Sequence, residues 1–282
     1  MVICQKISQI KSLLHPLKSE GKSIGLVPTM GSLHAGHISL LNAARKTCDL
    51  VVCSIFVNPI QFNNKADYNN YPVDFDEDLK ILEMNGNDIV FMPEAIDLYP
   101  ESQAIKLNFQ LLEKTMEGKF RPGHFNGVAL AIIKFLNIIN PDIIFLGQKD
   151  MQQAAIIRKL LFEMSFQTEL KVLPTIRESD GLAFSSRNRR LSGAQRIVAS
   201  SFYKALTLSK ELLLAGESPS EVGNKVRAFI NSIDGFSLEY FEIVNSNTME
   251  TKTAVNNHED ISLCIAGYVG EIRLLDNIAL ND

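Results

Sequence analysis

Hydrophobic and polar positions follow two alternating patterns along the first two-thirds of the chain. Short continuous runs rich in Ile, Val, Leu and Phe are typical of strands buried on both faces of a parallel sheet. Between them, apolar residues recur every three to four positions, as in amphipathic helices. The predicted strands are Ile24–Pro28, Leu50–Phe56, Ile89–Phe91, Ile143–Leu146 and Leu170–Leu173, and the predicted helices are Ile38–Lys46, Asp74–Met84, Gly127–Ile139 and Met151–Met164.

This alternation predicts an α/β fold built on a doubly wound, Rossmann-like parallel sheet. After Pro174 the order changes to helices followed by strands, which is typical of a small α+β domain. We therefore expect a larger domain over residues 1–176 and a smaller C-terminal α+β domain over residues 177–282. In the smaller domain the predicted helices are Ser192–Leu214 and Ser218–Ile233, each with its first serine as N-cap, and the predicted strands are Leu238–Val244, Ser262–Ile265 and Glu271–Leu275.

The composition is ordinary for a globular protein, with 46% hydrophobic and 21% charged residues among 282. The formal net charge of −4 argues against a general nucleic-acid-binding surface. The N-terminus has no apolar core of a secretory signal, and no run of about 18 apolar residues occurs, so we expect a cytoplasmic protein. The cysteines have neither metal-binding nor redox spacing, so we expect buried free thiols at Cys4, Cys48, Cys53 and Cys264.

The segment between the first predicted strand and the next helix carries candidate chemistry. It reads Thr-Met-Gly-Ser-Leu-His-Ala-Gly-His from position 29 to position 37. A strand-to-helix turn in an α/β fold presents free backbone N–H groups and the positive end of a helix dipole, which bind phosphate. Gly31 and Gly36 have the glycine spacing of a P-loop, but His37 and Ile38 replace the Lys and the Ser or Thr of that motif. We therefore expect a nucleotide site of another kind.

His34 and His37 lie three positions apart, so their rings would share one side of the first helical turn. Three interpretations stay open: two solvated histidines, a metal-binding pair, or two imidazoles that donate hydrogen bonds to phosphate oxygens, with Gly36 leaving room for the phosphate. Zinc needs three or four ligands, and no third Cys, His or carboxylate lies nearby at ligand spacing. A helix N-terminus disfavours the imidazolium, so the phosphate interpretation predicts neutral rings.

Charged side chains also occur in two segments that follow predicted strands along the chain. Lys149 is a compact positive charge just after the predicted strand Ile143–Leu146, and Asp150 beside it is a carboxylate of the type that holds Mg²⁺ together with phosphate oxygens. The alternative is a surface ion pair at the start of a helix. The sequence Ser-Ser-Arg at positions 185–187 supplies two hydroxyls and a guanidinium, which is a phosphate-binding set, and its alternative is an ordinary polar linker.

Several separated motifs resemble one protein family. The sequence His-x-Gly-His at positions 34–37 is similar to the signature of the HxGH nucleotidyltransferase-like superfamily. Together with four later motifs, it makes the stretch from about residue 20 to about residue 192 resemble the pantothenate synthetase (pantoate–β-alanine ligase) family. The later motifs are SIFVNPIQF at 54–62, RPGHFNGV at 121–128, FLGQKDMQQ at 145–153 and DGLAFSSRN at 180–188. Arg121 and His124 in the second of them lie either in a loop near the substrate or in a capped turn.

The resemblance implies an AMP-forming carbon–nitrogen ligase. Such an enzyme condenses pantoate with β-alanine through a pantoyl adenylate and releases AMP and pyrophosphate. The resemblance further implies ATP as substrate, Mg²⁺ held by Asp150 with the phosphates, a homodimer, and neither nucleic-acid nor membrane partners. It also implies that residues 1–176 bind nucleotide and pantoate and that residues 177–282 act as a lid.

The resemblance assigns site residues as well. His37 is implied to be the acid catalyst, with His34, Lys149 and Arg187 beside it in the catalytic set, and Gln61 and Gln153 are implied to bind pantoate or β-alanine. The implied ATP-binding residues are Met30, Gly31, Ser32, Leu33, His34, Ala35, Gly36, His37, Gly147, Gln148, Lys149, Asp150, Ile176, Phe184, Ser185, Ser186 and Arg187.

Two other functions stay open at this point. An adenylyltransferase or cytidylyltransferase acting on a phosphate-bearing small molecule would use the same histidine turn, but it would need Arg or Lys where Gln61 and Gln153 stand. A non-catalytic ATP sensor would bind nucleotide on the same sheet and would leave Lys149 and Asp150 unexplained.

Overall fold

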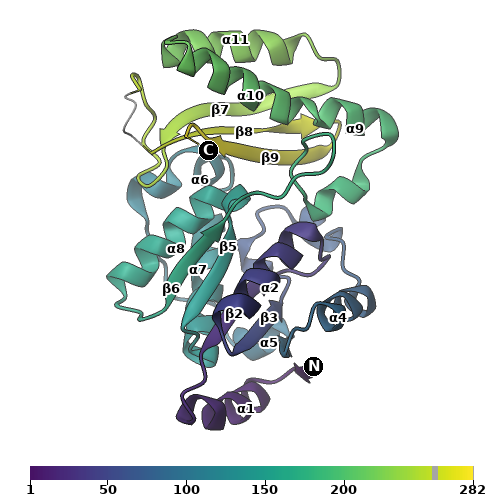
Figure 1. Cartoon of the computed structure of the whole chain (residues 1–282), viewed down its shortest axis with the longest axis vertical. Coiled ribbons are helices and arrows are strands. Elements are labelled where there is room, and N and C mark those ends of the chain that lie inside the picture. Colours follow the sequence, from purple (N-terminus) through teal and green to yellow (C-terminus); the bar gives the residue numbers. More distant parts are fainter. Residues whose placement is uncertain (256–259, 282) are drawn as a thin grey trace.

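The computed structural model describes residues 1–255 and 260–281, and its larger sheet confirms the predicted α/β fold (Figure 1). Six strands, all paired in parallel, lie in the order β1-β4-β3-β2-β5-β6. The chain moves outward from β2 to β4 and restarts with β5 on the other side of β2, so the topological switch point lies between β2 and β5. The strand bounds are β1 Val2–Cys4, β2 Ile24–Thr29, β3 Leu50–Ile55, β4 Ile89–Phe91, β5 Ile143–Gly147 and β6 Glu169–Leu173.

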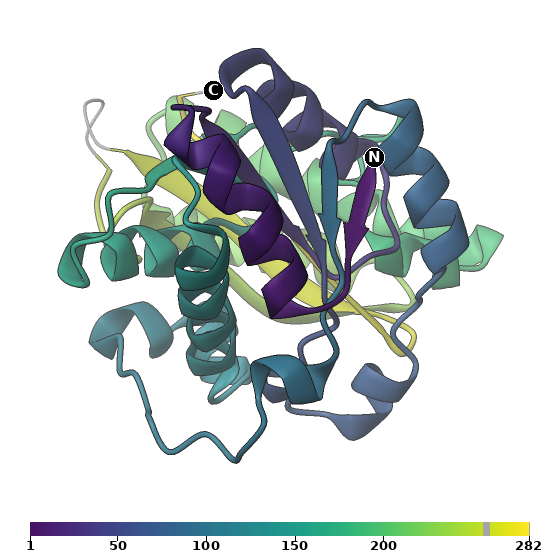
Figure 2. The ribbon, with the colours of Figure 1, turned by 90° about the horizontal axis from the view of Figure 1, so that it is seen from below.

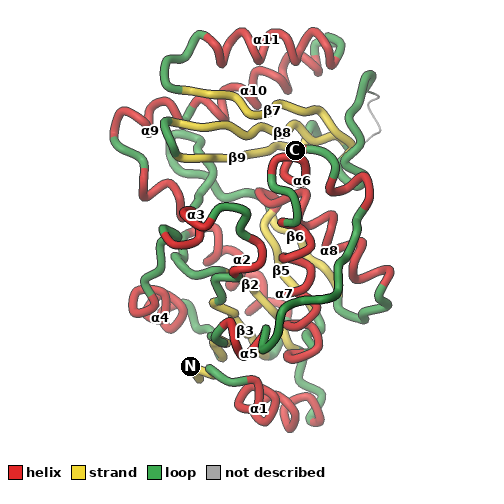
Figure 3. Tube along the Cα trace, turned by 180° about the vertical axis from the view of Figure 1, so that it is seen from behind, coloured by secondary structure: helices red, strands yellow, loops and turns green. Residues whose placement is uncertain are grey.

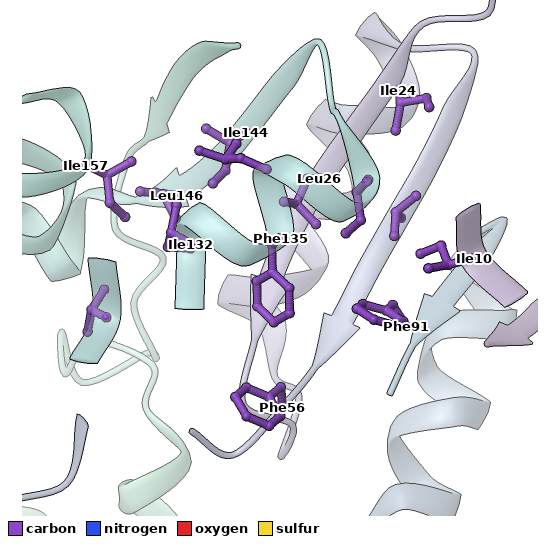
Figure 4. Close-up of a cluster of buried hydrophobic side chains, with 14 of the residues drawn as sticks. Ile10, Ile24, Leu26, Phe56, Phe91, Ile132, Phe135, Ile144, Leu146 and Ile157 are labelled. Carbon is purple, nitrogen blue, oxygen red and sulfur yellow. The ribbon is translucent and has the colours of Figure 1, made fainter. Parts of the chain in front are cut away.

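Helices cover both faces of this sheet. Side chains alternate along a strand, so Leu26 enters the core beneath α1, α7 and α8, whereas Val27 enters the core beneath α2 and α4. Figure 2 shows α1, in purple, beside α7, in teal. Figure 4 shows the first core, where Phe135 lies edge-on to both Phe56 and Phe91. The helix bounds are α1 Ile7–Ser19, α2 Ala35–Thr47, α4 Phe75–Met84, α7 His124–Ile139 and α8 Met151–Glu163.

A smaller antiparallel sheet, in the order β7-β8-β9, lies beyond the carboxyl ends of the parallel strands (Figure 3). Helices α10 and α11 pack on it, and Phe202 of α10 stacks on Phe236 with ring centroids 4.4 Å apart. Leu182 belongs to the core of this sheet, and the predicted division at residues 176 and 177 stays a prediction. The bounds are α9 Gly193–Ala199, α10 Ser201–Leu214, α11 Pro219–Asn231, β7 Phe236–Asn245, β8 Ile261–Val269 and β9 Ile272–Ala279.

The predicted single helix Ser192–Leu214 is wrong. The structure has two helices, α9 and α10, separated at Ser200. The Ser200 hydroxyl donates to the carbonyl oxygen of Ile197 at 2.8 Å, and such a bond competes with the regular helical hydrogen bond. The N-cap prediction is confirmed, because Ser192 and Ser218 each accept a hydrogen bond in their side chains from the backbone of the first turn.

The other predicted strands and helices are present, with ends shifted by a few residues and with longer β8 and β9. The edge strand β1 and helix α1 were not predicted. The cysteine prediction is confirmed, because all four thiols are free and buried. The remaining short elements are α3 Lys65–Asn69, α5 Ala95–Leu98, α6 Met116–Phe120, and the 3-10 helices η1 Pro59–Gln61, η2 Gln110–Glu113, η3 Gln148–Asp150 and η4 Ser186–Arg190.

Within residues 1–255 and 260–281, none of the helices has the length and apolar character needed to cross a membrane.

Candidate active site

A cavity of about 620 Å³ lies at the carboxyl ends of β2, β3 and β5. The loops after these strands contribute Met30 and the histidine turn, Gln61, and Lys149 to its wall. Residues 174–176 and 182–188 and strand β9 close the other side. Ligands of open α/β sheets bind at the carboxyl ends of the strands near the switch point, and the cavity lies there, between the β2 and β5 loops.

His34 and His37 lie side by side at the start of α2, with ring centroids 4.1 Å apart, and both line the cavity. The backbone N–H of His34 donates to Nδ1 of His37 at 3.3 Å, and the N–H of Gly36 donates to Nδ1 of His34 at 3.2 Å. A neutral imidazole that accepts at Nδ1 carries its proton at Nε2. Each ring therefore keeps an Nε2–H with which to donate to a ligand.

Burial keeps both rings neutral. It lowers the pKa of His37 to about 4 and that of His34 to about 2, and the charge of Lys149 adds to the lowering at both. This agrees with the neutral donors expected of a phosphate-binding pair. Among the described residues, no three His, Cys, Asp or Glu side chains are grouped so as to hold a metal ion. The neutral rings, each with an Nε2–H free of the backbone, are the donors that the phosphate interpretation requires.

Buried Asp78 of α4 fixes the backbone that leads to the histidines. Its two carboxylate oxygens accept the N–H groups of Ser32 and Leu33, each at 2.7 Å. A Cβ at Gly31, where φ is 80°, would lie 2.8 Å from Oδ2 of Asp78, so this close approach requires glycine. Five predicted ATP-binding residues do not line the cavity: Gly31, Ser32, Leu33, Ala35 and Gln148. The first three belong to the backbone that Asp78 holds.

Lys149 and Asp150 line the same cavity as the histidine turn. Nζ of Lys149 lies 3.9 Å from Oδ1 of Asp150, which is too long for a hydrogen bond. The lysine side chain is 21% exposed and that of the aspartate is 51% exposed. The pair is therefore loose, so the ammonium can meet an anion and the carboxylate can meet a cation.

The Ser-Ser-Arg motif at positions 185–187 also borders the cavity, with Ile176 and Phe184 beside it. The Ser186 hydroxyl donates to the carbonyl oxygen of Ser32 at 3.0 Å, which ties this segment to the histidine turn. Nη2 of Arg187 pairs with Asp67 of α3 at 3.0 Å. Sequence reasoning missed Asp67, because it lies 120 positions from its partner and in no motif.

Gln61 and Gln153 are brought to the same cavity from η1 and α8. Nδ2 of Asn58 donates to Oε1 of Gln61 at 2.9 Å and to the carbonyl oxygen of Gly127 at 3.0 Å, which orients the Gln61 amide. Within the described part of the chain, the side chain of Gln153 makes no hydrogen bond. Nε2 of Gln61 donates to Sδ of Met30 at 3.1 Å, so the Gln61 amide keeps one N–H and one oxygen lone pair for a small ligand, whereas the whole Gln153 amide is available.

Gly127 of α7 allows the Gln61 segment to approach closely. A Cβ there would lie 2.5 Å from the carbonyl oxygen of Ile60 and 2.7 Å from Cα of Gln61. We expect Gly127→Ala to lower the free energy of unfolding by about 1–3 kcal/mol and to raise KM for the substrate held by Gln61. Denaturant titration and steady-state kinetics measure the two effects.

The matched control is Gly223→Ala in α11, where nothing lies within 4 Å of an added Cβ. Alanine in an open helical position should raise the free energy of unfolding by about 0.5–1 kcal/mol. Equal destabilisation by the two substitutions would contradict the close-approach argument.

A network of ionic side chains also borders the cavity, where the antiparallel sheet meets α6. Glu117 of α6 accepts two hydrogen bonds from Arg273 of β9, at 2.9 and 2.6 Å, and lies 3.4 Å from Arg121. Burial raises the pKa of Glu117, but the Arg273 guanidinium outweighs burial and holds it at about 2. The sequence analysis did not identify Glu117 or Arg273. It left open whether Arg121 and His124 lie near the substrate, and the structure places both in the cavity wall.

Acidification should destabilise this site. Nδ1–H of His124 donates to the carbonyl oxygen of Gln61 at 2.9 Å, and burial lowers the pKa of His124 to about 3. The pKa values of His34 and His37 are lowered as well, whereas an unfolded histidine titrates near about 6.5. Below about pH 6.5 the unfolded chain therefore binds protons that the folded chain does not, and stability falls as the pH falls from about 6.5 toward 4.

We expect each of these histidines to contribute up to about 1.4 kcal/mol per pH unit to that fall. Denaturant titrations between about pH 7.5 and pH 5 measure the slope. His124→Asn keeps an N–H donor for the Gln61 oxygen but cannot titrate, so it should flatten the slope. A slope identical to that of the unsubstituted protein would show that His124 is not buried in its neutral form.

Comparisons with known proteins identify the family of the chain. The sequence profile of a family described as Pantoate-beta-alanine ligase matches residues 2–279. The chain is 44% identical over 280 residues to a Phocaeicola vulgatus protein named Pantothenate synthetase, and 41% identical over 281 residues to one from Cytophaga hutchinsonii. Each alignment covers 99% of both chains.

Solved structures give the same result. A crystal structure of pantothenate synthetase from Thermus thermophilus matches with a TM-score of 0.92 and 33% identity, over 99% of each chain. That of pantoate-beta-alanine ligase from Francisella tularensis, complexed with beta-gamma ATP and beta-alanine, matches with a TM-score of 0.82 and 34% identity, over 100% of this chain and 98% of the other. The chain therefore belongs to the pantoate–beta-alanine ligase family.

Proposed function

We propose that the protein condenses pantoate with β-alanine in an ATP-dependent reaction, through a pantoyl adenylate, to give pantothenate, AMP and pyrophosphate. One observation carries the proposal: His34, His37 and Lys149 line a single cavity with Gln61 and Gln153. Three donors suited to phosphate thus share one cavity with two amides suited to a hydroxy acid. Family membership and the ATP and beta-alanine complex of the Francisella relative support the same substrates.

The chemical problem is that a carboxylate resists attack by an amine. In the proposed first step a carboxylate oxygen of pantoate attacks the α-phosphorus of ATP, and the bond to pyrophosphate breaks. Negative charge builds on the phosphates, where Nε2–H of His34 and His37 and the Lys149 ammonium stabilise it. In the second step the amine of β-alanine attacks the acyl carbon, AMP leaves with the electron pair of the broken C–O bond, and the nitrogen releases a proton to solvent.

The proposal includes a Mg²⁺ ion held by Asp150. Mg²⁺ is held by one or two carboxylates together with phosphate oxygens and water. The half-exposed Asp150 carboxylate, loosely paired with Lys149, fits that role, whereas Asp67 is engaged by Arg187. The ion would neutralise phosphate charge there.

The amides define the acceptor side. Gln61 and Gln153 would bind the hydroxyl and carboxylate of pantoate, because an amide donates and accepts at once. A phosphate-bearing acceptor of an adenylyltransferase or cytidylyltransferase would call for cations at these two places. The Ser-Ser-Arg segment, with Phe184 beside it, would bind the nucleotide from the second-sheet side.

The proposal also includes the organisation that the resemblance implies. Residues 1–176 bind nucleotide and pantoate, and residues 177–282 act as a lid that excludes water from the adenylate. The protein works as a homodimer in the cytoplasm. Sedimentation of the purified chain tests the dimer.

The test of function is isotope exchange. The protein is incubated with ATP, Mg²⁺, pantoate and labelled pyrophosphate, without any amine. Reversible adenylation predicts pantoate-dependent incorporation of label into ATP. Adding β-alanine should then yield pantothenate and AMP. ATP binding without pantoate-dependent exchange would refute the ligase and favour a nucleotide sensor.

A further inference from the structure

The last strand of the second sheet reaches into the loop that carries Lys149. Nδ2 of Asn277, on β9, donates to the carbonyl oxygen of Gln148 at 3.0 Å and to that of Lys149 at 2.8 Å. Asn277 is 4% exposed, so these bonds are shielded from water. Because both partners are carbonyl oxygens, the orientation of the amide is unambiguous.

These two hydrogen bonds fix the backbone on both sides of one residue. The Gln148 carbonyl belongs to the peptide plane before Cα of Lys149, and the Lys149 carbonyl belongs to the plane after it. Fixing both planes fixes the direction of the Cα–Cβ bond. The lysine side chain thus leaves the loop in a direction that Asn277 sets.

The amide serves through its nitrogen alone. Oδ1 of Asn277 is buried and has no hydrogen-bond partner in the described part of the chain. A buried polar atom without a partner costs stability, and an apolar side chain would avoid that cost. The contacts that compensate for it are the two bonds to the Lys149 loop.

Asp276, the residue before Asn277 on β9, contacts the segment that precedes the Ser-Ser-Arg motif. The Asp276 carboxylate, 1% exposed, pairs with Arg177 at 2.6 Å, and Arg177 donates to the carbonyl oxygens of Gly181 and Asn277. Adjacent residues of one strand thereby hold the Lys149 loop and the residues before the Ser-Ser-Arg motif. The distance between Lys149 and Arg187 therefore depends on this strand.

We propose that Asn277 is a positioning residue for adenylation, which orients Lys149 toward the phosphates by holding the peptide planes on either side of it. This proposal rests on the proposed function and extends it. It gives Asn277, a residue of the antiparallel sheet, a role in positioning Lys149, which follows a strand of the parallel sheet. Asn277 is not among the residues that line the cavity of about 620 Å³, so its proposed effect passes through Lys149.

The test compares two identical substitutions in one sheet. Asn277→Asp replaces the donor by an oxygen that faces two carbonyl oxygens, so the loop must move. We expect kcat of the pantoate-dependent pyrophosphate exchange to fall about 10- to 100-fold, with KM for ATP within about threefold. Asn245→Asp in β7 is the control, because Oδ1 of Asn245 accepts N–H groups of Asn247 and Thr248, a role that aspartate keeps.

A second pair of variants separates positioning from general destabilisation. In a Lys149→Ala background, Asn277→Asp should lower exchange by less than about threefold, because the group it positions is gone. An equal fold loss in both backgrounds would overturn the proposal, and so would an unchanged kcat in Asn277→Asp. Asn277→Ala adds no carboxylate that could pair with Lys149, and it carries the same comparison if Asn277→Asp does not fold.

The unsubstituted protein is measured first in the same assay. Pantoate-dependent exchange by that protein establishes the proposed function independently of Asn277. Its absence refutes the proposed function and this inference together, whereas exchange that is insensitive to Asn277 refutes the inference alone.

Discussion

Lys149→Ala should lower pantoate-dependent exchange of pyrophosphate into ATP by about 10²–10³-fold while the protein stays folded. The ammonium lies in the cavity wall, and its ion-pair partner, Asp150, is 3.9 Å away. Its charge is therefore available to the phosphates, where negative charge builds as pyrophosphate leaves. Exchange rates at saturating ATP and pantoate, together with thermal melts, measure the effect.

Lys159→Ala is the matched control for this substitution. Lys159 lies on α8, ten positions further along the chain, and pairs with Glu163 at 2.8 Å with half-exposed side chains. Surface pairs of this kind contribute little, so exchange should be unchanged. A comparable loss from both substitutions, or no loss from Lys149→Ala, would remove Lys149 from the mechanism.

His37 should show the second large effect, and the structure predicts which replacement retains most activity. Nδ1 of His37 accepts the N–H of His34, which leaves Nε2–H as the donor to the ligand. His37→Ala should lower exchange by about 10²–10³-fold. His37→Gln can place an amide N–H near the Nε2 position and should retain the most activity, whereas His37→Asn places its polar atoms near the Nδ1 position.

The asparagine variant separates the two roles of the ring. Asn at position 37 can still accept the N–H of His34 and preserve the helix start, but it offers no donor at the depth of Nε2. If the histidine served only as a helix cap, His37→Asn would be the most active variant of the three. His15→Ala, at an exposed position on α1, should leave exchange unchanged.

Much of the fold follows from contiguous residues. The apolar runs at Ile24–Pro28 and Ile143–Leu146 became β2 and β5, because buried parallel strands need uninterrupted apolar residues. Ser192 and Ser218 became N-caps because a serine side chain satisfies the free N–H groups of the first turn. The broken helix at Ser200 was missed because a serine that bonds back to a carbonyl has the same sequence pattern as one facing solvent.

In the candidate site, too, some residues could be predicted from the sequence and others could not. The histidine turn, Lys149 and the Ser-Ser-Arg segment could be predicted from contiguous residues, because strand ends and helix starts are encoded locally and parallel strands carry their ends to one edge. Three further contacts arise from the packing of distant segments: Asp78 holds that turn, Asp67 pairs with Arg187, and Asn277 holds the Lys149 loop. Asp and Asn are common residue types with no periodicity of their own. Their partners lie 46, 120 and 128 positions away, so their roles exist only once the chain has folded and the two sheets have packed together.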